Sequence, residues 1–137
     1  MKRFFLLTLA SAALLGASAA PVKTYEVKSP DGRLALVLTA GERLSFTVAR
    51  DGETLVAPSE MALTLSTGEV LGESPRVRSA RRRAVTETID APLYRQSRFD
   101  AAYNELDLRL RGDYGILARA YDDGVCYRFY TERDGGL

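Results

Sequence analysis

The stretch Ala101–Glu132 reads AAYNELDLRLRGDYGILARAYDDGVCYRFYTE. Its first part alternates leucine with charged residues, which is the two-residue period of a strand with one buried and one solvated face. A second apolar run covers residues 115–121, and a third places Val125, Tyr127 and Phe129 on one face. Asp122-Asp123-Gly124 separates the last two runs, and Asp-Gly between apolar runs is typical of a hairpin because both residues accept left-handed backbone angles. The stretch therefore predicts a three-stranded antiparallel meander.

The rest of the chain continues the same period towards the N-terminus. Inward faces are predicted for Tyr25 and Val27; Leu34, Leu36 and Leu38; Leu44, Phe46 and Val48. Turns are predicted at 29–32, 41–43, 51–52 and 66–68, where Gly, Pro and Asp gather. We expect a short strand at 54–56 that Pro58 stops, another through Met61, Leu63 and Leu65, and an arginine-rich edge strand over 77–89. Since no window shows a helical period with caps, the fold class is all-β, an antiparallel β-sandwich.

The first residues predict a secretory signal. Lys2 and Arg3 precede an apolar segment at 4–15, and Ala17-Ser18-Ala19 is a small-residue cleavage site. The apolar segment is too short to span a membrane. We therefore expect a signal peptide at 1–19, a β-sandwich domain at 20–137, and export to the periplasm or the cell exterior.

Composition narrows the function classes. The 19 basic and 18 acidic residues nearly balance, which argues against a nucleic-acid partner. Arg81-Arg82-Arg83 is interpreted as a solvated strand edge, with an acidic partner or a membrane surface as the alternative. The sequence contains no histidine, which excludes triads and imidazole metal sites. The single cysteine, Cys126, is interpreted as a small buried or half-buried hydrophobic residue.

The carboxylates form no convincing catalytic or metal site. Glu105 and Asp107 share the strand face opposite the leucines, so a solvated face is expected for both. Asp122 and Asp123 are interpreted as turn formers. Arg128 lies within an apolar run and must be paired or solvated, so we expect Glu105 or Asp107 to be its partner. Among the tyrosines that could stack on a sugar, Tyr127 is expected in the core.

Two motifs carry a family resemblance. Tyr103-Asn104-Glu105-Leu106, and the segment from Arg119 through Asp122-Asp123-Gly124 and Arg128 to Phe129, resemble the N-terminal domain of glycoside hydrolase family 97. Ser29-Pro30-Asp31-Gly32 fits the same domain. The segment Pro92-Leu93-Tyr94-Arg95-Gln96 and the lack of tryptophan are similar to the branch with retaining α-galactosidases.

The resemblance implies a galactose-mutarotase-like super-sandwich that is incomplete here, and a (β/α)₈ catalytic barrel that this chain is too short to include. The implied function is the non-catalytic front domain of a secreted α-galactosidase or α-glucosidase, which packs on the barrel and shapes a pocket for an α-linked oligosaccharide. The family implies calcium, with its ligands outside this chain, and no catalytic residue or cofactor within it. The alternative is a free-standing exported carbohydrate-binding or scaffold β-domain.

Overall fold

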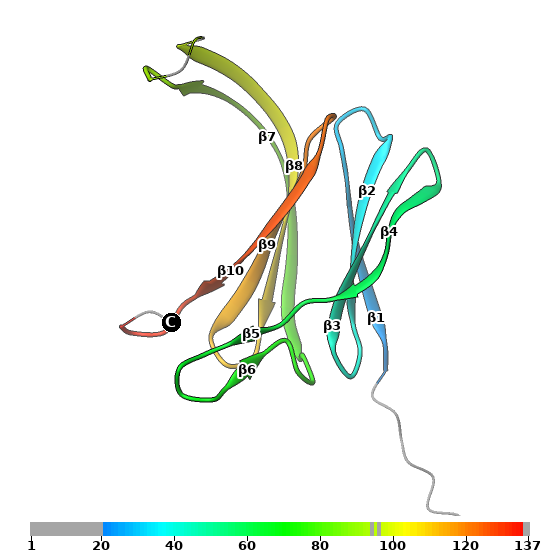
Figure 1. Cartoon of the computed structure of the whole chain (residues 1–137), viewed down its shortest axis with the longest axis vertical. Helices are drawn as coiled ribbons and strands as arrows, with labels where there is room; N and C mark the ends of the chain where they lie inside the picture. The colour runs from blue at the N-terminus through cyan, green and yellow to red at the C-terminus, as the bar shows by residue number, and fades with distance from the viewer. Residues whose placement is uncertain (1–20, 94, 96, 136–137) are drawn as a thin grey trace, which may run out of the picture.

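The computed structural model describes residues 21–93, 95 and 97–135, which form two four-stranded antiparallel sheets, a small hairpin and no helix. The first sheet contains β1 (Lys23–Lys28), β2 (Leu34–Ala40), β3 (Leu44–Arg50) and β4 (Glu53–Glu60), in that order. The second has the order β10 (Val125–Thr131), β9 (Tyr114–Ala120), β8 (Arg98–Leu110) and β7 (Val77–Asp90). The hairpin of β5 (Leu63–Thr64) and β6 (Val70–Leu71) lies between them in the sequence. The sheets stand side by side in Figure 1, so the predicted all-β antiparallel sandwich is confirmed.

The core lies between the two sheets, where the predicted period placed it. On β2 and β3 it contains Leu34, Leu36, Leu38, Leu44 and Val48; on β8 and β9 it contains Leu106, Leu108, Leu110, Ile116, Ala118 and Ala120. All of these side chains are buried, since strands of this period direct every second residue to the opposite sheet. The predicted signal peptide at 1–19 lies outside the described residues.

The turns show which sequence signals were reliable. Asp51 and Gly52 form the two-residue loop between β3 and β4 with φ of 50° and 85°, as a type I′ turn requires. Asp122-Asp123-Gly124 does join β9 to β10, where Tyr121 N–H donates to Gly124 O at 2.8 Å. None of its three residues has the left-handed backbone that motivated the prediction. The position of this hairpin is therefore confirmed, but the reason given for it was wrong.

The predicted meander is confirmed as β8, β9 and β10, and β7 extends it. β7 pairs with β8 along its whole length and is an edge of the second sheet, as expected for the arginine-rich segment. Two other predictions were wrong. Pro58 does not end β4, because it lies in an irregular part of this edge strand where no ladder N–H is required. The strand through Met61 and Leu65 is reduced to Leu63–Thr64, with Met61 buried beside it.

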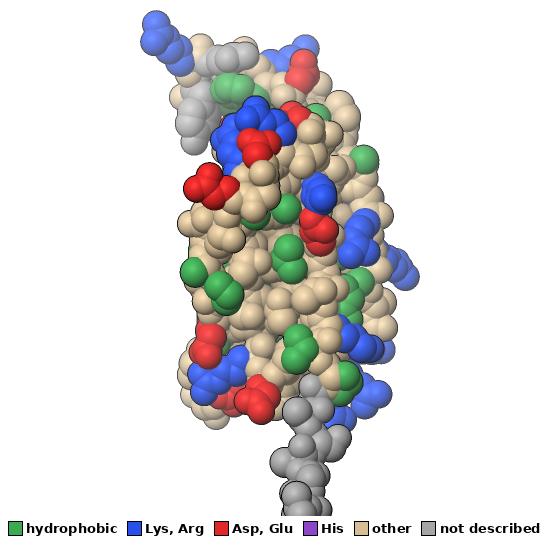
Figure 2. All heavy atoms as spheres, turned by 90° about the vertical axis from the view of Figure 1, so that its right-hand side faces the viewer, with side chains coloured by type: hydrophobic (Ala, Val, Ile, Leu, Met, Phe, Trp, Pro, Cys, Tyr) green, Lys and Arg blue, Asp and Glu red, His purple; other side chains and the backbone are tan. Residues whose placement is uncertain are grey.

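The outer face of the first sheet carries short side chains. The outward residues of β2 and β3 pair as Ala35 with Ala49, Val37 with Thr47, and Thr39 with Ser45. Figure 2 looks onto this side of the molecule, and the charged side chains gather towards its margins. Within the part of the chain that the structure describes, no helix is long and apolar enough to cross a membrane.

Candidate functional site

The outer face of the second sheet carries three of the family-motif side chains, those of Tyr103, Glu105 and Arg128. Because residues alternate along a strand, Tyr103, Glu105, Asp107 and Arg109 of β8 point away from the leucine core. The register places Arg83 of β7 and Arg119 of β9 on either side of Glu105. A carboxylate in the middle of the sheet is therefore flanked by a guanidinium on each neighbouring strand.

Glu105 is the centre of this cluster. Arg83 Nε donates to Glu105 Oε1 at 2.6 Å, and Arg119 Nε donates to Oε2 at 2.8 Å. The two arginines cover the carboxylate so fully that Glu105 is only 2% exposed. The expected solvated position of Glu105 was wrong, because the long side chains of the neighbouring strands close over it.

The electrostatics of the cluster favour full ionisation. Desolvation is the largest influence on Glu105 and opposes its charge, but the hydrogen bonds from Arg83 and Arg119 outweigh it and lower its pKa. Arg119 is also desolvated, yet bonding to Glu105 and Tyr121 raises its pKa. Glu105 is thus held as an anion and cannot act as a general acid near neutral pH.

Two tyrosines complete the cover on one side. The Arg119 guanidinium lies 4.5 Å from the centre of the Tyr103 ring, a cation–π contact, and the Tyr121 ring lies 4.9 Å from that of Tyr103. The Tyr103 hydroxyl donates to Glu87 at 2.9 Å. Desolvation, and then this bond, raise the pKa of Tyr103. The cluster is therefore a packed unit of aromatic rings and ion pairs.

A second group lies further along the same face. The Tyr130 hydroxyl donates to Asp107, whose other oxygen accepts a bond from Arg109 Nε at 3.4 Å. To reach Asp107 the Tyr130 ring lies across Gly115, where a Cβ would overlap it. Desolvation, followed by the bond to Asp107, raises the pKa of Tyr130 to about 12. Gly115 thus provides the space for an aromatic side chain that covers the sheet.

Asn104 points the other way and joins the two sheets. Its Nδ2 donates to the carbonyl of Lys28, the last residue of β1, at 2.9 Å. Asp122 makes a second connection, because its Oδ1 accepts the backbone N–H of Asp31 at 2.9 Å. The Tyr-Asn-Glu-Leu, Asp-Asp-Gly and Ser-Pro-Asp-Gly motifs therefore meet at one end of the sandwich.

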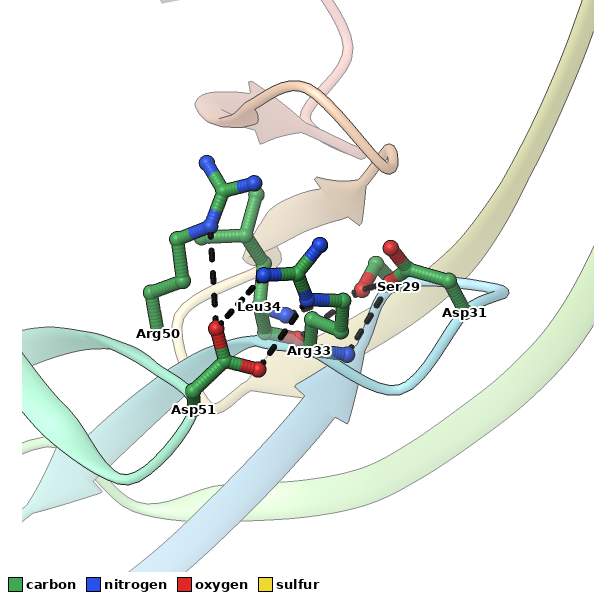
Figure 3. A network of polar contacts seen from close by, with 6 residues as sticks. All are labelled: Ser29, Asp31, Arg33, Leu34, Arg50 and Asp51. Atoms are coloured by element: carbon green, nitrogen blue, oxygen red, sulfur yellow. Dashed lines mark hydrogen bonds and ion pairs between the residues drawn. The ribbon is translucent and has the colours of Figure 1, made fainter.

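The Ser-Pro-Asp-Gly turn is itself fixed by short-range bonds, drawn in Figure 3. Asp31 Oδ1 accepts from the Ser29 hydroxyl and from Arg33 N–H, and the pKa of Asp31 is lowered chiefly by the Ser29 bond. Leu34 N–H donates to the buried Ser29 Oγ at 2.9 Å. Arg33 forms a two-pronged pair with Asp51 at 3.1 and 2.9 Å. These bonds order the turn whose Asp31 N–H donates to Asp122.

Three predictions for β10 were wrong. Arg128 is exposed, and among the residues described no carboxylate pairs with it, since Glu105 and Asp107 bond to other side chains. Its cross-strand neighbour is Leu117. Cys126 is exposed rather than buried. Tyr127 faces the interior and contacts the Phe46 ring at 5.2 Å, but it remains 40% exposed because it lies on an edge strand.

The chemistry available to this face is limited. Within residues 21–93, 95 and 97–135, no three Asp, Glu or Cys side chains are grouped so that they could hold a metal ion. Arg128, Leu117 and Tyr130 border an open depression with Asp107 and Arg109. Asp123 and Gly124 are placed only in the turn. Tyr103, Asn104, Glu105 and Asp122 are thus engaged in hydrogen bonds, whereas the Asp123 and Arg128 side chains are exposed to solvent.

Sequence reasoning missed Arg83, Arg119 and Tyr130 as partners of the carboxylates. Arg119 could have been found, because pairing the runs on either side of Gly112 places it directly across from Glu105. Arg83 could not, since the length of the loop before β8 gives no register.

Comparison with known proteins gives consistent results. Residues 27–135 match the family model described as Glycosyl-hydrolase 97 N-terminal. A retaining alpha-galactosidase of Bacteroides thetaiotaomicron is 37% identical over 110 residues, which covers 80% of this chain and 17% of that protein. A probable retaining alpha-galactosidase of Streptomyces bingchenggensis is 32% identical over 111 residues, covering 78% of this chain and 17% of that protein. The chain therefore spans about a sixth of the curated relatives that it matches.

Solved structures resemble the fold at low sequence identity. A glycoside hydrolase family 97 enzyme from Pseudoalteromonas sp. strain K8, in complex with acarbose, superimposes with a TM-score of 0.72 at 18% identity. The match covers 82% of this chain and 18% of that one. A beta-arabinopyranosidase gives the same TM-score at 20% identity, over 81% of this chain and 18% of that one.

Proposed function

Because the chain belongs to the glycosyl-hydrolase 97 N-terminal family, we propose that it is the non-catalytic front β-sandwich of an exported α-glycosidase, favouring α-galactosides. Its role is to pack on a catalytic barrel and help to shape the mouth of the pocket that receives an α-linked oligosaccharide. The calcium that the family implies is bound by residues of the full-length enzyme outside this chain.

The observation that carries this proposal is how the motif residues are used. Asn104 and Asp122 each bond to backbone of the first sheet, and Glu105 is enclosed by two arginines. Side chains that bind a substrate or transfer protons must be able to contact the substrate. The side chains of Asn104, Asp122 and Glu105 are instead engaged in bonds within the sandwich. A shape-determining domain needs a fixed relation between its sheets, and the motifs supply it.

A hydrolysis assay tests the proposal. The purified chain is incubated with nitrophenyl α-galactoside and nitrophenyl α-glucoside beside the Bacteroides relative, and we expect turnover from the relative alone. A Glu105→Gln, Asp107→Asn double variant is the matched control. Hydrolysis by the chain that disappears in the double variant would overturn the non-catalytic role.

The open depression beside Arg128 supports the alternative, a carbohydrate-binding domain. Its border combines an exposed guanidinium, an apolar Leu117 and the polar pair Asp107 and Arg109, groups that suit a sugar with both polar and apolar faces. Calorimetric titration with galactose, glucose and maltose distinguishes the two, because saturable binding that Arg128→Ala abolishes would favour the alternative.

A further inference from the structure

A pocket of about 410 Å³ lies between the two sheets, at the end of the sandwich remote from the bond that joins Asn104 to Lys28. Lys23, the first residue of β1, lines it from the first sheet. Arg76, which precedes β7, and Arg111, which follows β8, line it from the second. The Arg111 N–H donates to the Arg76 carbonyl at 2.9 Å, so these two residues are neighbours. We call the space lined by Lys23, Arg76 and Arg111 the basic pocket.

Three positive charges meet in the basic pocket without a counter-charge. Among the described residues its lining includes no Asp or Glu, and none of its three cations forms an ion pair with a carboxylate. Two residues away along the same strands the cations are paired, Arg78 with Asp113 at 3.1 Å and Arg109 with Glu132 at 2.9 Å. Because like charges held close together repel, an anion that enters the pocket relieves this repulsion.

The rest of the lining indicates the shape of that anion. Guanidinium groups offer paired N–H donors that match the oxygens of a phosphate group, and a lysine adds a compact charge. Ala40, Pro75 and Val77 give the pocket an apolar wall beside these cations. A bare ion would leave the wall in contact with water, whereas the volume of the pocket suits a small organic molecule. The ligand therefore combines an anionic group with a compact body that has apolar C–H faces.

We infer that the basic pocket binds a hexose phosphate, with the phosphate monoester among the three cations and one face of the sugar ring against the apolar wall. A phosphate monoester carries nearly two negative charges at neutral pH, which three cations can neutralise, whereas a sulfate monoester carries one. The inference does not depend on the proposed function, because the basic pocket is separate from the outer face of the second sheet and from the depression beside Arg128.

Calorimetric titration of the 137-residue chain tests the inference, at constant ionic strength and about pH 8, where a phosphate monoester is doubly charged. We expect glucose 6-phosphate to bind saturably at one site per chain. Glucose 6-sulfate and inorganic phosphate should each bind at least about fivefold more weakly, because the first lacks a charge and the second lacks a body that packs on the apolar wall. Glucose itself should show no saturable binding.

Matched variants separate the pocket from the net charge of the chain. Arg76→Gln and Arg111→Gln each remove one charge and its donors, and each should weaken the binding of glucose 6-phosphate at least about tenfold. Arg81→Gln removes the same charge from the outer face of the second sheet and should change the affinity less than about twofold. Since all three side chains are exposed, each variant should melt within about 2 °C of the wild type.

Four outcomes would overturn the inference: no saturable binding of glucose 6-phosphate, an equal loss in Arg81→Gln, inorganic phosphate that binds as tightly as the ester, or a preference for phosphatidylcholine vesicles containing phosphatidic acid. The last would make a lipid headgroup the ligand. If a glutamine variant does not melt cooperatively, Arg76→Lys and Arg111→Lys replace it. These keep the charge but lose the paired donors of the guanidinium, and should weaken binding at least about threefold, whereas unchanged affinity in both would refute the assigned contacts.

Discussion

Replacing Glu105 with glutamine should destabilise the chain by about 2 kcal/mol. The substitution keeps the shape of the side chain and one acceptor oxygen but removes the charge that faces Arg83 and Arg119. Breaking a buried ion pair costs about 3–5 kcal/mol when the remaining charge stays buried. Here Arg83 is 66% exposed and can return to water, whereas Arg119 is 30% exposed and keeps its contact with Tyr103. The cost is therefore that of about one lost charge-assisted hydrogen bond.

The effect should depend on pH with a definite sign. The pKa of Glu105 is lowered from 4.5 in the folded chain, so its contribution to stability is complete above that value. As the pH falls below 4.5 and through the lowered pKa of the folded state, the wild type takes up a proton and loses the contribution. The difference between wild type and Glu105→Gln should thus be constant near neutrality and shrink in acid.

Urea unfolding followed by tyrosine fluorescence measures this difference, and the chain has seven tyrosines and no tryptophan. At pH 7 we expect a free-energy loss of about 2 kcal/mol, or roughly 8 °C in melting temperature. Asp123→Asn, at an exposed turn position, is the control and should change stability by less than about 0.5 kcal/mol. A Glu105→Gln variant as stable as this control, or a difference that grows in acid, would refute the reasoning.

Three further predictions follow from the same geometry. Gly115→Ala should cost about 1–3 kcal/mol because its Cβ overlaps the Tyr130 ring, and the cost should largely vanish in a Tyr130→Ala background, which a double-mutant cycle by urea unfolding checks. Asn104→Ala should cost about 1 kcal/mol by leaving the Lys28 carbonyl without its donor, and thermal melts against wild type measure it; an unchanged melt would mean that water replaces the amide. Cys126 should react with Ellman's reagent in the folded chain nearly as fast as in urea, and strong protection would contradict its exposed position.

The sequence predicted the strand face on which a side chain lies better than it predicted how far that side chain is buried. The period of two assigned the inward leucines of β2 and β8 correctly, because the alternation of side chains along a strand is a local property. It also placed Glu105 correctly on the face opposite the leucines. Whether an outer residue is buried depends on the length of the side chains beside it on adjacent strands. Those neighbours can be identified only when the register of the strands is known. Glu105 is central and flanked by arginines, whereas Cys126 is on an edge strand.

The error at Arg128 has the same origin. Its predicted partners lie on β8, but β9 separates the two strands, and neighbouring strands are about 4.8 Å apart. Leu117 occupies the intervening position in the row that joins Arg128 to Asp107. Tyr130, two residues further along β10, reaches Asp107 instead, because Gly115 leaves its path clear. The predicted meander already implied this strand order, but without the register that places Tyr130 across from Gly115 the sequence could not distinguish these two candidates.

The family motifs combine two tasks that sequence inspection could not separate. Within Tyr103-Asn104-Glu105 the side chains alternate in direction, so Asn104 bonds to the first sheet while its neighbours build the outer cluster. A change that loosens Asn104 would alter the angle between the sheets, and a change at Glu105 would alter the shape of the outer face. The outer face keeps a fixed position only if its sheet is fixed against the other sheet. Glu105 orders the outer face and the adjacent Asn104 bonds its sheet to the other one, so neighbouring motif residues meet both requirements.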